Sequence, residues 1–146
     1  MAKTYQRTWW MRMGNVLATM LVRAGVNVGP IHLLTVLGRT TGLPRTTPVA
    51  VVEQQRQRYL VATYGLVNWV RNLRAQGEAT LTRGRRSETI KAMELPAKEA
   101  ALVLKACLAG NGRIFQGFFD VTAEASLADF EREAALHPVF ALQKIQ

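Results

Sequence analysis

The chain has 146 residues, of which 49% are hydrophobic and 20% charged, and its formal net charge is +9. This size and composition suit one globular domain, residues 1–146, and exclude an intrinsically disordered chain. No apolar run reaches the roughly 18 residues that span a bilayer, and no secretory pattern opens the chain, so we expect a cytoplasmic protein. Its single cysteine, Cys107, excludes an internal disulfide and a cysteine-rich metal site.

The positive charge is concentrated in the first two thirds of the chain. Residues 1–92 carry 14 Lys and Arg against 3 acidic residues, whereas residues 93–146 carry 5 against 7. Arginine outnumbers lysine 14 to 5, and its guanidinium fork matches phosphate and carboxylate geometry. We therefore expect an anionic partner, which leaves open a phosphorylated cofactor, a nucleic acid and an acidic membrane surface.

An amphipathic helix is predicted at about residues 8–25, where apolar residues recur at three- and four-residue steps. Two roles are open for its apolar face. Trp9 and Trp10 stand beside Lys3 and Arg12, a pattern that favours contact with a lipid interface. The alternative is that this face covers the core of the domain. The first role would place the protein peripherally on the inner face of the cell membrane.

The middle of the chain predicts an antiparallel sheet. Strands are expected in residues 31–37, 48–53 and 58–64 and on both sides of Gly84. The polar segment "QQRQ" joins two of them as a hairpin, and "RGRR" at residues 83–86 is expected at a solvated hairpin tip. One helix, residues 66–76, interrupts the strands and ends at Gly77. The short connections between the strands favour antiparallel pairing.

Two more helices and a closing strand are predicted after the sheet. Pro96 opens a helix that runs to about Leu108. The segment "SLADFEREAAL", residues 126–136, begins with a capping pattern, and "VFALQKI" follows as a strand. The expected fold class is therefore α+β and mainly β, an antiparallel barrel-like sheet with helices packed outside.

The segment "VLGRTTGLPRTTPVAV", residues 36–51, has the composition of an anion-binding loop. It matches neither the P-loop nor the dinucleotide glycine pattern. Arg39 and Arg45 flank a turn in which Gly42 can adopt a positive φ and main-chain N–H groups can point outward. This chemistry suits a phosphate or several carboxylates. The alternative interpretation is a loop whose arginines are simply solvated.

Three stretches together resemble the deazaflavin-dependent nitroreductase family. They are "LLTVLGRTTGLPRTTPVAVV", "RYLVATYG" and "VNWVRNLRAQGEATL", whose order and spacing cover about residues 31–95. That family is similar to the FMN-binding split β-barrel proteins, and its members use reduced coenzyme F420 to reduce quinones, nitroaromatics or activated double bonds. The resemblance implies a split β-barrel of antiparallel strands with packed helices and F420, rather than FMN, as the cofactor. Split barrels often pair, so a homodimer is left open.

The resemblance also implies a set of site residues. The cofactor-binding residues are Arg39, Thr40, Thr41, Arg45, Thr46, Thr47, Pro48, Val61, Ala62, Thr63, Tyr64, Asn68, Trp69, Val70, Arg71 and Asn72. The first seven match family positions near the anionic phosphodiester and oligoglutamate tail, and the others border the deazaflavin. Tyr64 and Thr63 are the candidates for stabilising negative charge on the acceptor. Tyr64 stands where some members have lysine, so the choice of acceptor is open.

Three functions remain open at this point. The first is an F420-dependent reductase of a lipophilic acceptor, a quinone, a nitroaromatic or an activated double bond such as that of a fatty-acyl compound. The second is a non-catalytic protein that binds F420 or lipid at a membrane surface. The third is a basic nucleic-acid-binding module, against which the lack of a recognisable motif argues. For His32 and His137 a structural or surface role is favoured over metal ligation, Cys107 is expected to be buried, and no metal is expected.

Overall fold

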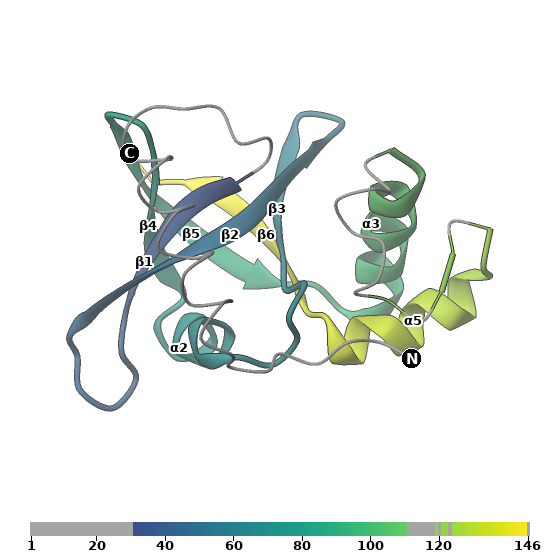
Figure 1. The fold of residues 1–146 in the computed structure, drawn as a ribbon, viewed down its shortest axis with the longest axis horizontal. Coiled ribbons are helices and arrows are strands. Elements are labelled where there is room, and N and C mark those ends of the chain that lie inside the picture. The colour runs from purple at the N-terminus through teal and green to yellow at the C-terminus, as the bar shows by residue number, and fades with distance from the viewer. Residues whose placement is uncertain (1–30, 111–118, 120, 123, 146) are drawn as a thin grey trace, which may run out of the picture.

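The computed structural model describes residues 31–110, 119, 121, 122 and 124–145 (Figure 1). The predicted helix at residues 8–25, with Trp9 and Trp10, lies outside the described residues. Six antiparallel strands form a closed barrel in the order β1-β2-β3-β6-β5-β4. The strands are β1 (Ile31–Leu37), β2 (Pro44–Gln54), β3 (Gln57–Val61), β4 (Glu78–Arg83), β5 (Arg86–Glu94) and β6 (Val139–Lys144). The predicted mainly β class, with an antiparallel barrel and helices packed on it, is confirmed.

The barrel interior is one apolar core that a short helix closes at one end. Leu34, Val51 and Phe140, from three different strands, lie in this core, and all are buried. The helix α2 (Asn68–Gln76) contributes Val70 and Leu73 to the same core. Apolar residues that alternate along a strand all point to one face. The alternation in the sequence therefore produces a filled barrel with α2 over one end.

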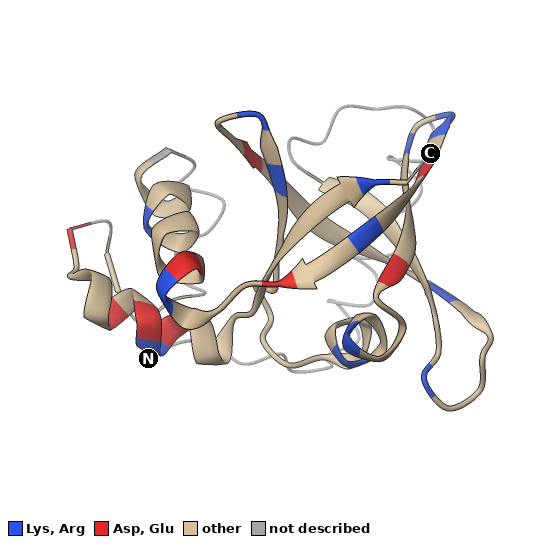
Figure 2. Ribbon diagram, turned by 180° about the vertical axis from the view of Figure 1, so that it is seen from behind, with Lys and Arg blue, Asp and Glu red and all other residues tan. Residues whose placement is uncertain are grey.

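A second core lies outside the barrel. The helices α3 (Ala97–Gly110) and α5 (Leu127–Leu136) pack together beside the barrel (Figure 1). Their apolar residues join outward-facing residues of β2 and β3, among them Val52 and Val61. Acidic residues gather on this pair of helices, whereas most of the basic residues lie on the barrel and α2 (Figure 2). The uneven charge of the sequence thus becomes a separation in space.

Two of the predicted helix ends agree with the structure, whereas α2 begins at Asn68 rather than at residue 66 and α3 continues to Gly110. Gly77 ends α2 with φ 72°, and its N–H donates to the carbonyl of Leu73 at 2.8 Å. At the start of α5, the Ser126 hydroxyl accepts a hydrogen bond from the N–H of Asp129 at 3.2 Å. Glycine at a left-handed helix end and serine at a helix start are strong local signals, and here both predictions are confirmed.

The β2–β3 turn is tighter than its sequence indicates. Gln54 pairs with Gln57, so only Gln55 and Arg56 form the turn, and both have positive φ, at 52° and 67°. Two-residue hairpins require this left-handed conformation, which asparagine and glycine adopt most readily. The four polar residues of "QQRQ" were predicted to connect the two strands. The connection is shorter, because the first and last of these residues pair with each other as part of the strands.

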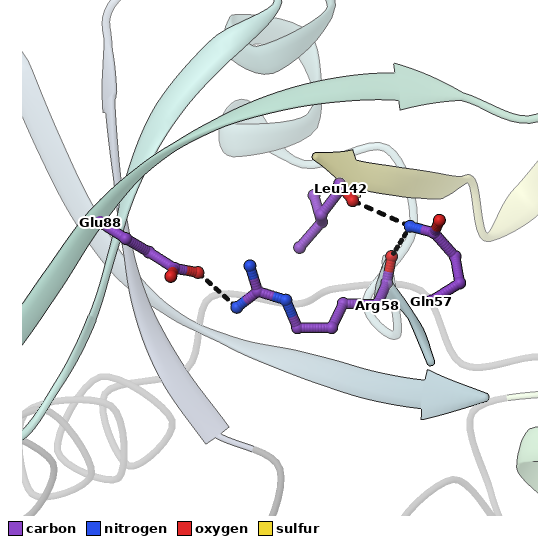
Figure 3. A network of polar contacts seen from close by, with 4 residues as sticks. All are labelled: Gln57, Arg58, Glu88 and Leu142. Carbon is purple, nitrogen blue, oxygen red and sulfur yellow. Dashed lines mark hydrogen bonds and ion pairs between the residues drawn. The ribbon is translucent and has the colours of Figure 1, made fainter. Parts of the chain in front are cut away.

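At the end of the barrel away from α2, a polar network joins three strands (Figure 3). Arg58 of β3 and Glu88 of β5 form an ion pair, and their side chains are 30% and 23% exposed. The Gln57 amide donates to the carbonyls of Leu142, at 2.8 Å, and of Arg58, at 2.9 Å. Arg58 follows the same alternation as the inward-facing Leu60. The two ends of the barrel therefore differ, one closed by apolar residues of α2 and the other by charged side chains.

The β1–β2 hairpin extends beyond the barrel as an arm, residues 36–47 (Figure 1). The second strand of the hairpin is predicted to begin at Pro48, but β2 begins at Pro44. The paired register continues outward to Leu37 and Pro44, and threonines, which favour strands, occupy much of the added length. The predicted long loop is therefore wrong in extent, because only residues 38–43 form the connection.

Candidate functional site

Three segments meet at the end of the barrel that α2 covers. They are the base of the arm in β2, the turn of residues 62–67 and the start of α2. Ala50 pairs with Val61, so the residues that follow Val61 leave the barrel next to the base of the arm. Val67 is the N-cap of α2. The sequence segments predicted to bind the cofactor are thereby brought to one end of the fold.

The arm presents two polar side chains toward α2. Arg45 pairs with Val36 and Thr47 with Leu34, and directly paired residues share a face of the sheet. Leu34 and Val36 are buried in the same core as Val70 of α2. Arg45 and Thr47 therefore lie on the α2 side of the arm, with Arg45 exposed and Thr47 half-buried.

Thr46 and Pro48 lie on the opposite face of β2, because successive residues of a strand alternate. The Thr46 hydroxyl is 2.8 Å from that of Thr35 in β1, so it takes part in a cross-strand hydrogen bond. The predicted site treated Thr46 and Thr47 as one unit, and the structure separates their side chains.

The turn at the tip of the arm is held by its own hydrogen bonds. The N–H of Gly38 donates to the carbonyl of Leu43, and that of Gly42 to the carbonyl of Gly38, both at 2.9 Å. Gly42 has φ 69°, as predicted. The Thr41 hydroxyl accepts from the N–H of Leu43 at 3.2 Å. Thr41 therefore stabilises the turn, whereas Thr40 is exposed.

Asn72 connects α2 to the tip of the arm. Its side-chain oxygen accepts hydrogen bonds from the main-chain nitrogen of Arg39, at 3.0 Å, and from Nη1 of Arg39, at 2.8 Å. Asn72 is 5% exposed, while Arg39 is exposed. The asparagine side chain is thus occupied in holding Arg39, which the sequence motif alone did not indicate.

The N-terminal end of α2 is a possible anion-binding position. No side chain in the described part of the chain caps it, and its first turn contains no acidic residue. The first N–H groups of a helix lack partners within the helix and carry a partial positive charge. Asn68 is exposed, and Trp69 is half-buried with its ring 6.1 Å from that of Phe140. An anion placed here would meet main-chain N–H donors.

The turn after β3 offers two half-buried side chains. Val61 and Ala62 are 1% and 0% exposed, so neither residue reaches the surface. Thr63 and Tyr64 are half-buried. The carbonyl of Ala62 accepts from the N–H of Gly65 at 3.1 Å and from Nδ1 of His137 at 2.9 Å. The sequence favoured a structural or surface role for His137, and this contact makes it a structural one.

Exposed arginines surround this end of the fold. Arg39, Arg45 and Arg71 make no ion pair with any of the residues that the structure describes. Arg74, one turn along α2, instead forms a two-point contact with Glu94, at 2.6 and 2.9 Å, and this hydrogen bonding raises its pKa. Guanidinium groups, hydroxyls and helix N–H groups together fit a ligand with a phosphodiester and several carboxylates.

The described part of the chain contains no group of His, Cys, Asp and Glu that could hold a metal ion. It also contains no helix that is long and apolar enough to cross a membrane.

The chain is similar to known proteins across most of its length. The family described as F420H(2)-dependent quinone reductase matches residues 7–111. A solved F420-H2 dependent reductase, FDR-A, is 26% identical with a TM-score of 0.52, and the match covers 82% of this chain and 100% of that one. No curated protein matches the sequence.

Two further solved structures share the fold. HutZ, a heme storage protein from Vibrio cholerae, is 13% identical with a TM-score of 0.57, covering 80% of this chain and 82% of its own. A chain described as a domain-swapped dimer is 23% identical with a TM-score of 0.54, covering 92% and 97%. The predicted family resemblance, the enzymatic class and the F420 cofactor are confirmed by the family match. The chain belongs to the F420H(2)-dependent quinone reductase family.

Proposed function

We propose that this reductase holds F420 between the arm and the N-terminal end of α2 and transfers its reducing equivalents to a lipophilic quinone. One observation carries the proposal. Arg45 and Thr47 lie on the face of the arm that looks toward α2, whose first turn has no acidic residue and, among the described residues, no side-chain cap. Donors converge there from two elements, and no described acidic residue pairs with Arg45.

In this proposal the site residues have different tasks. Arg45, Arg71 and the hydroxyl of Thr47 bind the phosphodiester and carboxylates by charge-assisted hydrogen bonds. Asn68 and Trp69 contribute main-chain N–H groups at the start of α2, and the Trp69 ring forms a wall.

The remaining predicted residues act at the edges of the site or support it. Arg39 adds positive charge at the arm tip, where Asn72 fixes it. Val61, Ala62 and Val70 are buried, so their part is to support the turn and the helix beside the ring. The other members of the predicted set, for which we propose only peripheral or structural parts, are Thr40, Thr41, Thr46 and Pro48.

Tyr64 and Thr63 stand where an acceptor would meet the protein. When bound, reduced F420 supplies a hydride from C5. A quinone that receives a hydride develops negative charge on its oxygen, and hydroxyl and peptide N–H donors stabilise such charge when they are fixed in advance. The half-buried Thr63 and Tyr64 provide hydroxyl donors on the turn between β3 and α2. Nitroaromatics and activated double bonds develop comparable charge and are the alternative acceptors.

The test is anaerobic oxidation of F420H2 by the protein with a quinone, a nitroaromatic and an enone supplied in separate reactions. We expect the quinone to give the highest kcat/KM. Tight F420 binding with no turnover of any acceptor would instead identify a carrier. A salt-sensitive shift with DNA and no F420 binding would identify a nucleic-acid-binding module.

A location at an anionic membrane surface is a second proposal, and it rests on residues 1–25 of the sequence. Lys3, Arg7 and Arg12 accompany Trp9 and Trp10 there, and each basic residue near such a surface contributes about 1 kcal/mol. The intact protein should sediment with anionic vesicles at low salt, and a Trp9→Ala/Trp10→Ala variant should do so less while binding F420 normally. Intact protein that stays in the supernatant would contradict the proposal.

We also propose that the chain forms a homodimer. The supporting observation is that a solved structure with the same fold is described as a domain-swapped dimer. Light scattering of the purified protein tests this directly, and a mass of one chain at micromolar concentration would contradict it.

A further inference from the structure

The main-chain N–H and carbonyl of Ala62 both form hydrogen bonds with the junction between α5 and β6. Its N–H donates to the carbonyl of Pro138 at 2.9 Å, which extends the β3–β6 ladder by one step. Its carbonyl accepts from Nδ1 of His137 at 2.9 Å and from the N–H of Gly65 at 3.1 Å. The residues between Ala62 and Gly65 are Thr63 and Tyr64, so the junction defines both ends of the turn that carries them.

His137 is an unusual choice for this position if its role is packing alone. The side chain is 2% exposed, and its ring lies 4.5 Å from that of Phe119. Because a carbonyl oxygen can only accept a hydrogen bond, Nδ1 of His137 must carry the proton that is donated to the carbonyl of Ala62. Nε2 is buried without a hydrogen-bond partner among the described residues. The donor at Nδ1 is therefore the contact that histidine offers here and that an apolar side chain of similar size lacks.

Gly65 limits the turn from the other side. It has φ 86°, and a Cβ at this position would lie 3.2 Å from the carbonyl oxygen of Leu136, the last residue of α5. The turn is therefore pressed against the end of the helix while His137 holds the Ala62 carbonyl. These two contacts leave the main chain of Thr63 and Tyr64 little freedom to rotate.

We propose that His137 is a positioning residue for the reaction, which sets the orientation of Thr63 and Tyr64 through the Ala62 carbonyl. The inference rests on the proposed function, in which this turn stabilises charge on the acceptor. The hydrogen bond of His137 is made to the turn, whereas Arg45 and Thr47 lie on the arm. Losing its hydrogen bond therefore lowers kcat and leaves the affinity for F420 nearly unchanged, because a small misplacement of reacting groups slows the reaction step more than it weakens binding.

Two replacements separate the hydrogen bond from the packing. His137→Phe fills the volume without a donor, and His137→Asn places an amide N–H near the position of Nδ1. We expect His137→Phe to lower kcat about tenfold with the F420 Kd within about twofold of wild type, and His137→Asn to recover most of the loss. Wild-type kcat in His137→Phe, an equal loss in both variants, or a rise in the Kd that matches the fall in kcat would overturn the proposal.

A second measurement needs no coenzyme. The Gly65 N–H donates to the carbonyl that His137 holds, so its hydrogen exchange reports whether the turn has loosened. Exchange at Gly65 should be about tenfold faster in His137→Phe than in wild type and close to wild type in His137→Asn. Unchanged exchange in His137→Phe would overturn the inference even if F420 binds elsewhere, whereas wild-type protein that fails to bind F420 contradicts only the proposed function. If His137→Phe does not fold, His137→Gln, whose amide lies near the position of Nε2, replaces it with the same expectations.

Discussion

The side-chain oxygen of Asn72 accepts two hydrogen bonds from Arg39, one from the main chain and one from the guanidinium group. The two residues are 33 positions apart, one in the buried face of α2 and the other at the tip of the arm. One amide oxygen thus fixes both the path of the arm and the orientation of an exposed cation. A substitution of Asn72 should therefore change both the rigidity of the arm and the position of the Arg39 charge.

Asn72→Ala should therefore affect both stability and binding. It leaves the Arg39 donors without their partner, and we expect a loss of about 1–3 kcal/mol in the free energy of unfolding, measured by urea denaturation. Affinity for F420 should fall with it. Asn72→Asp keeps the acceptor but adds a negative charge beside the site, so this variant should retain the arm contact and still bind F420 more weakly. F420 affinity at the wild-type level in Asn72→Asp would contradict the proposed placement of the anion.

Arg45→Ala should weaken F420 binding by about 1.5–3 kcal/mol, the usual contribution of a charge-assisted hydrogen bond. Arg86→Ala removes another exposed arginine, from the β4–β5 hairpin, and should change the affinity little. Calorimetric titration of both variants gives the comparison. The reverse order of effects would place the site at the other end of the barrel.

Gly65→Ala and Gly77→Ala form a matched pair. Both glycines have positive φ, at 86° and 72°, so each substitution should cost about 1 kcal/mol of stability. An added Cβ at Gly77 meets nothing within 4 Å, whereas at Gly65 it lies 3.2 Å from the Leu136 carbonyl. Turnover should fall in Gly65→Ala and stay near wild type in Gly77→Ala when both are assayed well below their melting temperatures. Equal turnover in the two variants would show that the turn does not take part.

Much of the fold follows from local signals in the sequence. Gly77 and Ser126 mark helix ends with residues that few other side chains can replace there. The start of β2 was misplaced because Pro44 and the threonines after it were interpreted as loop. Only their pairing with β1, which no local pattern encodes, makes them strand.

The candidate site was predictable as a set of segments but not as a set of side chains. Thr46 and Thr47 are adjacent in the sequence and lie on opposite faces of the arm. The roles of Asn72 and His137 depend on contacts across 33 and 75 positions, which single residues in a sequence do not reveal. A buried asparagine on the apolar side of a predicted helix is the one signal that could have pointed to the Arg39 contact.

Cys107 should be unreactive in the folded protein and should make its stability sensitive to alkaline pH. Burial raises the pKa of its thiol from 9.0 to about 12, against a smaller opposite effect of the hydrogen bond from Gln54. The stability from keeping the thiol protonated is complete below pH 9 and is lost as the pH rises toward 12. Urea denaturation at pH 7, 9 and 10.5 should show a steeper decline for wild type than for Cys107→Ala. Parallel declines, or rapid labelling of the native thiol at pH 8, would contradict this.

The most direct test of the account is a titration of the wild-type protein with F420 and with FMN at physiological salt. Both molecules carry a tricyclic ring and a phosphate group, but only F420 adds the carboxylate tail that Arg39, Arg45 and Arg71 would meet. We predict clearly tighter binding of F420, with a preference that shrinks as salt is added, because exposed charges are screened. Equal or tighter binding of FMN would contradict the central claim that the arm and the start of α2 form the F420 site.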